Sequence, residues 1–122
     1  MSDVESISAI TLVTSDMGRS VRFYEALGFE KRYGGEAADF TSFHVGSGYL
    51  NIALRAEVGN VSDWGRSIFY VSNVDAMYAR VVEAGFTPEF DPRDATWGER
   101  YFHVRDPDGH ELSFARPLDV EL

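Results

Sequence analysis

Hydrophobic and polar residues change their spacing several times along the chain, and each change marks a new element. Residues 6–14 alternate between the two kinds, which predicts a half-buried β-strand. The spacing then becomes four and three at Met17, Val21 and Tyr24, which predicts a helix over residues 16–27 with these side chains on one face. Short strands separated by glycine-rich turns are predicted next, at residues 30–33, 40–45 and 49–55.

The second half of the chain repeats this order of elements. A predicted strand at 66–72 precedes a predicted helix at 73–84, whose apolar residues Val74, Tyr78 and Val81 again follow a spacing of four and three. Each half therefore reads as a strand, a helix and three further strands. The last three strands of the second half are predicted at residues 87–90, 99–105 and 110–115.

An internal repeat links the two halves. Residues 13–29 match residues 70–86 without a gap, and downstream a Phe-His-Val tripeptide and the strand after it recur. Three matches in the same order predict a duplicated βαβββ module. The downstream matches align His44 with His103 and Asn51 with Glu111.

Both predicted helices carry signals at their ends. Asp16 and Asn73 precede them, and a side-chain oxygen at that position can accept from an unpaired backbone N–H group. Gly28 and Gly85 follow them, and glycine suits the left-handed position after a helix. These signals fix where each helix begins and ends.

The length of 122 residues fits a single domain, which we assign to residues 1–122. The repeat divides this domain into two modules joined by a linker that is rich in polar residues and glycine. We place module 1 at about 5–56, the linker at 57–65, module 2 at about 66–116 and a C-terminal arm at 117–122.

Charge narrows the choice of partners. The chain has 20 acidic and 11 basic residues and a net charge of −9, so we expect no binding to nucleic acid or to an anionic membrane surface. Such a chain would attract cationic ligands, although the charge can also serve solubility alone. The absence of cysteine excludes disulfides and thiolate sites. The acidic start MSDVES lacks an apolar segment, so we expect a cytoplasmic protein.

Three segments together resemble the vicinal oxygen chelate superfamily, which includes glyoxalase I, extradiol dioxygenases and bleomycin-resistance proteins. They read LVTSDMGRSVRFYEALGF, FYVSNVDAMYARVVEAGF and VRDPDGHELSFARPL, and they span most of the chain. The resemblance implies an α+β fold in which two βαβββ modules form an eight-stranded, mixed, incompletely closed barrel-like sheet. It also implies helices outside, a ligand cleft inside and a homodimer.

The resemblance implies particular positions for metal ligands. Metal-using members carry a histidine on the first strand of a module and a glutamate on the last strand. These positions fall on Ala9 and Arg66, and on Ser113 with Asn51 or Ala53 as its counterpart. None of them is a histidine or a carboxylate, so the usual ligand set is absent. This departure favours the metal-free, bleomycin-resistance-like branch, with no cofactor.

Strand alternation offers other polar groups. If Leu112 packs under a helix, Glu111 and Ser113 face the cleft, and by the same logic so do His44 and His103. These histidines are either neutral and hydrogen-bonded or part of a non-standard site for a divalent metal ion with Glu111. A further histidine, His110, sits beside a turn and is expected to be solvated.

Two arginines could act in a ligand site or in ion pairs. Arg66 can grip a carboxylate or phosphate in a bidentate way, or pair with a nearby acid such as Asp63, Glu99 or Glu111. For Arg105, pairing with Asp106 or Asp108 is the simpler expectation.

Aromatic residues near the predicted cleft can form a flat wall for a planar ligand. Trp64 and Trp97 flank strands of module 2, and Phe40, Tyr49 and Tyr101 can join them. The two tryptophans can equally cover the barrel ends or lie in a dimer contact.

From these residues we expect a metal-independent protein that captures a planar, aromatic or cationic small molecule. The alternative is a metal-dependent lyase or dioxygenase with the ligands His44, His103 and Glu111. A small accessory domain acting through its dimer surface is a third reading. The expected ligand-binding residues are Arg66, Trp64, Trp97, Tyr101, His103, Glu111, Ser113, His44, Asn51 and Phe40.

Overall fold

A computed structural model describes residues 2–118 and divides the chain into two compact units, Met1–Gly59 and Asn60–Leu122. The boundary falls inside the linker predicted at 57–65. No helix within residues 2–118 is long and apolar enough to cross a membrane.

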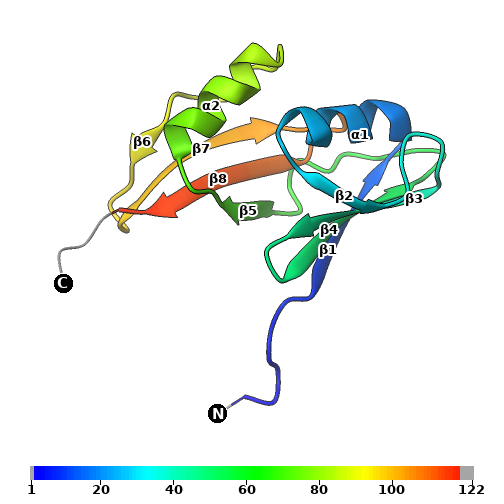
Figure 1. Ribbon diagram of the computed structural model, residues 1–122, viewed down its shortest axis with the longest axis horizontal. Coiled ribbons are helices and arrows are strands. Elements are labelled where there is room, and N and C mark those ends of the chain that lie inside the picture. The colour runs from blue at the N-terminus through cyan, green and yellow to red at the C-terminus, as the bar shows by residue number, and fades with distance from the viewer. Residues whose placement is uncertain (1, 119–122) are drawn as a thin grey trace. The chain divides into compact units, whose positions relative to one another are not determined.

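The first unit is a four-stranded mixed sheet with one helix along it (Figure 1). Its strand order is β1-β4-β3-β2, in which β1 and β4 run parallel and the other neighbours run antiparallel. The elements are β1 (Ala9–Thr14), α1 (Met17–Ala26), β2 (Glu30–Tyr33), β3 (Phe40–Val45) and β4 (Gly48–Leu54).

The second unit has the same topology, with the strand order β5-β8-β7-β6 and a parallel β5–β8 pair. The predicted α+β class and the two βαβββ modules are therefore confirmed, and the eight strands form two mixed sheets with no closed barrel among the described residues. The elements are β5 (Arg66–Tyr70), α2 (Val74–Glu83), β6 (Arg93–Asp94), β7 (Glu99–Arg105) and β8 (Glu111–Pro117).

One predicted strand is wrong. Residues 87–90 are not in a strand, and the only backbone bond to β7 there runs from Glu89 N to His103 O at 2.8 Å. Pro88 has no N–H to donate to a neighbouring strand, which explains why pairing does not extend along this run. The short edge strand β6 forms instead in the loop that follows. Pro117, predicted as the first residue of the C-terminal arm, is the last residue of β8, and residues 119–122 of that predicted arm lie outside the described part.

The predicted helix ends are confirmed. Asp16 Oδ1 accepts from Arg19 N at 3.0 Å, and Asn73 Oδ1 accepts from Ala76 N at 2.9 Å. Each bond satisfies a backbone donor that the first helical turn leaves unpaired. After the helices, Gly85 has a φ of +93°, in the left-handed region that favours glycine.

Each helix covers one face of its own sheet. In the first unit, Tyr24 on α1 meets Phe43 on β3, with the ring centroids 5.7 Å apart. In the second unit, Tyr78 on α2 meets Phe102 on β7 edge to face at 5.3 Å, and Phe102 meets Phe114 on β8. Because side chains alternate along a strand, the neighbouring residues face away from the helices. By this alternation His44 and His103 lie on the open faces of their sheets, which are the faces opposite the helices. Their place in a ligand cleft stays a prediction.

The strand register corrects the repeat alignment downstream of the helices. Arg66 and its repeat counterpart Ala9 pair with Glu111 and Tyr49 respectively. Tyr49, and not Asn51, is thus the counterpart of Glu111. The shift of two residues keeps every side chain on its predicted face but moves it along the strand.

The same correction separates the two histidines. His44 pairs with Tyr49 in the first sheet, whereas Arg105 pairs with Glu111 in the second. Arg105 is therefore the counterpart of His44, and His103 lies two residues away from it along β7, opposite Ser113. The recurring tripeptide marks similar strands, but the two histidines occupy different positions in their sheets.

Two glycines with similar backbone angles make a matched test of the fold. Gly34 has a φ of +95°, and a Cβ there would lie 2.4 Å from the carbonyl oxygen of Phe40. Gly85 has a φ of +93°, with nothing within 4 Å of a Cβ. We expect Gly85→Ala to lower the free energy of unfolding by about 1 kcal/mol through backbone strain alone. Gly34→Ala should cost at least about 1 kcal/mol more, because a backbone atom must also move. Urea denaturation measures both losses, and equal losses would contradict the predicted contact.

Candidate functional site

The open face of the second sheet, on the side opposite α2, carries the largest group of predicted site residues. Strand pairing arranges its side chains in rows across β5, β8 and β7, with neighbouring rows about 7 Å apart. The three rows are Arg66–Glu111–Arg105, Ile68–Ser113–His103 and Tyr70–Ala115–Tyr101.

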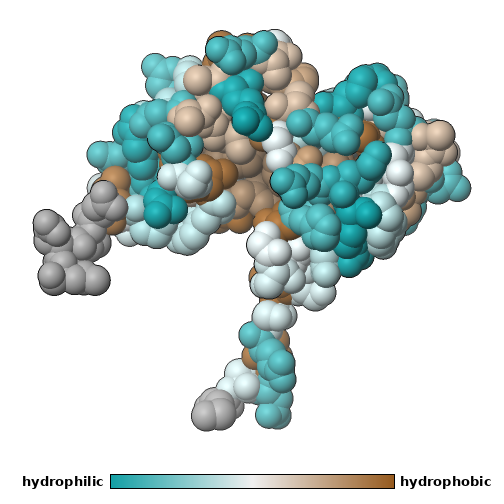
Figure 2. Space-filling model, viewed as in Figure 1, coloured by the Kyte–Doolittle hydropathy of each residue, from teal (hydrophilic) through white to brown (hydrophobic). Residues whose placement is uncertain are grey.

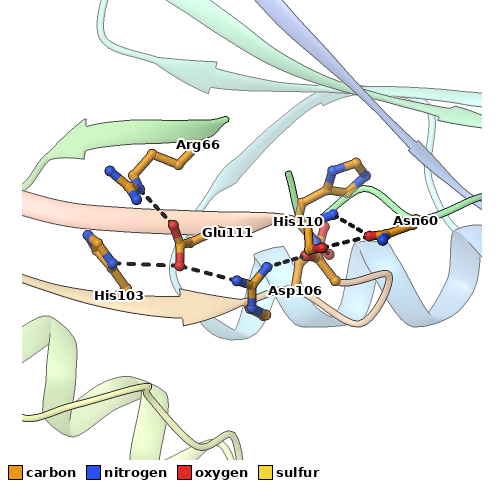
Figure 3. A network of polar contacts seen from close by, with 9 residues as sticks. Asn60, Arg66, His103, Asp106, His110 and Glu111 are labelled. Carbon is orange, nitrogen blue, oxygen red and sulfur yellow. Dashed lines mark hydrogen bonds and ion pairs between the residues drawn. The ribbon is translucent and has the colours of Figure 1, made fainter. Parts of the chain in front are cut away.

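Glu111 is the centre of a polar network at one end of this face (Figure 3). Only 8% of the residue is exposed. Arg66 Nε donates to Glu111 Oε1 at 2.7 Å, and Arg105 Nη2 lies 3.4 Å from Oε2. His103 Nδ1 lies 3.7 Å from the same Oε2. Of the two roles left open for Arg66, the structure shows the ion pair with Glu111.

The partners of Glu111 decide its ionisation. Burial opposes the charged form, but hydrogen bonds from the Glu89 carboxyl and from Arg66 outweigh it, so the pKa of Glu111 is lowered. The pKa of Glu89 is raised, first by loss of solvent and then by its hydrogen bond with Glu111. Of the two carboxyl groups, Glu111 therefore loses its proton at the lower pH.

His103 is held in its neutral form. Burial lowers its pKa, and the nearby charges of Arg66, Arg93 and Arg105 act in the same direction, while Glu111 opposes them. Its side chain is 14% exposed. A neutral imidazole beside a buried carboxylate can accept or donate a hydrogen bond to a ligand but adds no positive charge to the face.

Glu89, His103 and Glu111 are the group among residues 2–118 whose donor atoms could surround a metal ion, all lying within 4.8 Å of one another. Two carboxylates and an imidazole are suitable ligands by type. However, both oxygens of Glu111 already face guanidinium groups, which would repel a cation bound there. The arrangement therefore does not fit a metal centre unless Arg66 and Arg105 move. The predicted metal set differs from this group, because it included His44, which belongs to the first unit.

Aromatic rings line the other end of the same face. Tyr101 lies between Trp97 and His103, with ring centroids 5.2 Å away on each side. Phe90 meets His103 at 5.1 Å and Tyr101 at 5.5 Å. Glu99 accepts from Trp97 Nε1 at 2.9 Å, which orients the exposed indole. We call Phe90, Trp97, Tyr101 and His103 the aromatic wall.

Phe90 is the member of this wall that the sequence did not identify. It lies in the run that was predicted to be a strand, where alternation gave no reason to bring it to His103. The guanidinium carbon of Arg93 lies over the Phe90 ring, 3.8 Å from its centroid. In the side of the molecule shown in Figure 2, tan and brown hydrophobic residues reach the surface among hydrophilic ones. Exposed apolar residues on this open face include Ile68 and Tyr70.

Trp64 lies away from the aromatic wall, at the turn between β7 and β8. Its Nε1 donates to His110 Nδ1 at 3.2 Å. His110 is only 3% exposed, so the expectation that it is solvated is wrong. Its backbone N–H donates to Asp106 Oδ1, which also accepts from Asp108 N. The indole and the turn together bury the imidazole.

Arg105 also departs from expectation. It donates to the carbonyl oxygen of Gly109 at 2.9 Å and contacts Glu111, not Asp106 or Asp108. The reason lies in the turn, where Asp106 Oδ1 already accepts backbone N–H groups. Sequence proximity favoured the aspartates, but the register places Arg105 beside Glu111.

Three predicted site residues, His44, Asn51 and Phe40, lie in the first unit. His44 is exposed, and Phe40 stacks on Tyr33 at 6.3 Å. Asn51 Nδ2 donates to Thr11 Oγ1 at 3.3 Å, while its Oδ1 is buried without a partner among the described residues. This unit also has a depression of about 530 Å³, which contains none of the predicted site residues. It is lined by Ser15, Asp39, Leu54, Arg55 and Ala56.

Comparison with known proteins identifies the family. Residues 6–114 match the family described as "Glyoxalase/Bleomycin resistance protein/Dioxygenase superfamily". The chain belongs to this superfamily. The resemblance seen in the sequence is therefore confirmed at that level, and the match covers both modules.

Individual relatives leave the specific activity open. An uncharacterized protein of Mycobacterium bovis is 42% identical over 48 residues, which are 39% of this chain and 32% of that protein. A bleomycin resistance determinant encoded on the transposon Tn5 is 18% identical, with a TM-score of 0.76 over 93% of this chain and 98% of its own. Lactoylglutathione lyase from Agrobacterium tumefaciens is 20% identical, with a TM-score of 0.71 over 92% and 93% of the two chains. These structural matches establish the shared fold.

The lowered pKa of His103 predicts how stability depends on pH. Below the ordinary histidine value of 6.5, the unfolded chain takes up a proton at this position that the folded protein resists. The free energy of unfolding should therefore fall as the pH drops from about 7.5 to about 5. The variant His103→Gln should show a smaller fall, since it has no group to protonate there. Urea denaturation at several pH values measures the difference, and parallel curves for the two proteins would contradict it.

Proposed function

We propose that this member of the superfamily binds a planar, aromatic small molecule on the open face of the second sheet without the help of a metal ion. The observation that carries this proposal is the pairing of Glu111 with Arg66 at 2.7 Å and with Arg105. It occupies the buried carboxylate that a metal ion on this face would need. The same face keeps aromatic rings close together and partly exposed.

The aromatic wall supplies the binding surface in this proposal. A flat ligand that covers Tyr101 and Trp97 removes apolar area from water, which is worth roughly 25 cal/mol per Å². Stacking against the ring faces adds a preference for planar molecules. Glu99 limits the motion of the Trp97 indole, which reduces the entropy lost on binding.

A metal-dependent enzyme of the lyase or dioxygenase type is the second candidate function. The observation in its favour is the group of Glu89, His103 and Glu111, whose donor atoms lie within 4.8 Å of one another. A fold shared with a lactoylglutathione lyase is compatible with it. For this candidate, Arg66 and Arg105 would have to release Glu111.

The expected homodimer and cytoplasmic location also stand as proposals. The superfamily supports a small-molecule ligand as the main partner. A cationic ligand remains one option from the net charge of −9, and the local charges on the second sheet bear on that choice below.

Binding to the aromatic wall can be followed directly. We expect a panel of planar naphthalene and quinoline derivatives to include compounds that quench tryptophan fluorescence, because Trp97 is 65% exposed beside Tyr101. Tyr101→Ala should weaken the best compound about tenfold, as expected for losing one stacked ring. Tyr33→Ala is the matched control, since Tyr33 is an exposed aromatic residue of the first unit. Equal affinity in the wild type and the Tyr101→Ala variant would count against the wall.

Metal analysis separates the two candidate functions. Protein purified without chelators should carry far less than one equivalent of Ni, Zn, Mn or Fe, because two guanidinium groups face the Glu111 carboxylate. The measurement is elemental analysis of the wild type and of His103→Ala. A stoichiometric metal in the wild type that is lost in His103→Ala would support the metal-dependent enzyme and overturn our proposal of metal-free binding.

A further inference from the structure

Arg66 has hydrogen-bonding capacity that its ion pair does not use. Its Nε donates to Glu111, and among residues 2–118 its terminal nitrogens, Nη1 and Nη2, make no hydrogen bond or ion pair. The side chain is 48% exposed. In Figure 3 its guanidinium group lies on the same side of Glu111 as the His103 ring. The bond at Nε fixes the plane of the guanidinium group and leaves its outer edge open to a ligand.

Glu111 does not need that outer edge. Its second oxygen is already within 3.4 Å of Arg105 Nη2, so Arg105 compensates part of its charge. Both terminal nitrogens of Arg105 already have a partner, because its Nη1 donates to the carbonyl oxygen of Gly109 and its Nη2 contacts Glu111. Arg66 is thus the cation of the network that remains available to another anion.

We propose that the outer edge of Arg66 binds the carboxylate of the ligand, so that the ligand class is an aromatic carboxylate. This inference rests on the proposed function, because the aromatic wall must hold the ring. A guanidinium edge and a carboxylate form two parallel hydrogen bonds in one plane, a geometry that no ammonium group offers. Glu111 acts as a positioning residue that orients the guanidinium group.

The spacing of the face suits such a ligand. Arg66 lies in the first row, His103 in the second and Tyr101 in the third. Neighbouring rows are about 7 Å apart, which is close to the distance between a guanidinium group and the ring of a paired aryl carboxylate. The ring of a carboxylate bound at Arg66 therefore reaches the level of the second row. His103, the member of the aromatic wall in that row, lies on β7, with β8 between it and the strand of Arg66.

A carboxylate fits this position better than the alternatives. A cationic ligand would be drawn by the net charge of −9, but charges more than about 8–10 Å away are screened by salt, and the contact here is with a cation. A phosphate dianion would bring a second charge toward Glu89 and Glu111. A single negative charge matches the single available guanidinium edge.

Calorimetry with three compounds of one shape tests the inference. The probes are 2-naphthoate, the uncharged 2-naphthamide and the cationic 2-naphthylmethylammonium ion. The proteins are the wild type, Arg66→Gln, Arg66→Lys and the control Arg22→Gln, which removes an exposed arginine that pairs with Glu36 in the first unit. The fold of all three variants is checked against the wild type by circular dichroism and by thermal unfolding.

We expect 2-naphthoate to bind the wild type and Arg22→Gln equally well, and to bind Arg66→Gln at least about tenfold more weakly. Arg66→Lys should restore only part of the affinity, since lysine keeps the positive charge but lacks the two parallel N–H donors of a guanidinium group. The amide should bind all four proteins with similar, weaker affinity. Equal binding of naphthoate and amide, or tighter binding of the ammonium ion, would overturn the carboxylate inference while leaving the aromatic wall in place. Binding of none of the three would overturn both.

Discussion

A buried carboxylate constrains the open face of the second sheet. Glu111 is 8% exposed, and an isolated charge in that position would cost several kcal/mol. The strand register places Arg66 on β5 and Arg105 on β7 on either side of Glu111, and their positive charges offset this cost. Because these two side chains must point at Glu111, their orientation is set before any ligand arrives. The positions of the free guanidinium edge and of neutral His103 follow from that one compensation.

The two units share a fold but differ in the chemistry of their open faces. The row that contains Glu111 in the second sheet corresponds to Ala9, Tyr49 and His44 in the first. That row has no acidic residue, and its tyrosine instead lies under Arg32 at 3.6 Å. Helix caps and core packing require particular residue types, so both modules retain them. An open face requires only that its charges be compensated, which many combinations of residues can do.

This freedom explains why family membership leaves the activity undetermined. The same architecture occurs in a bleomycin resistance determinant and in a lactoylglutathione lyase. Core packing under the helices maintains the architecture, whereas the side chains on the opposite face determine whether a metal ion or an organic molecule binds. In this chain the guanidinium groups beside Glu111 weigh against a bound cation, and our proposal of an anionic ligand rests on them.

The sequence by itself determined the features that depend only on residues close together along the chain. Alternation, helical spacing and the caps at Asp16 and Asn73 are local signals, and they predicted the modules and the face on which His103 lies. The tertiary structure decided the partners of Arg105, the burial of His110 and the place of Phe90 in the aromatic wall. Each of these depends on how strands pair or on how a loop folds back over a sheet. A shift of two residues in register leaves the hydrophobic pattern unchanged, but it gives every residue a different partner on the adjacent strand. The register is therefore known only from the folded chain.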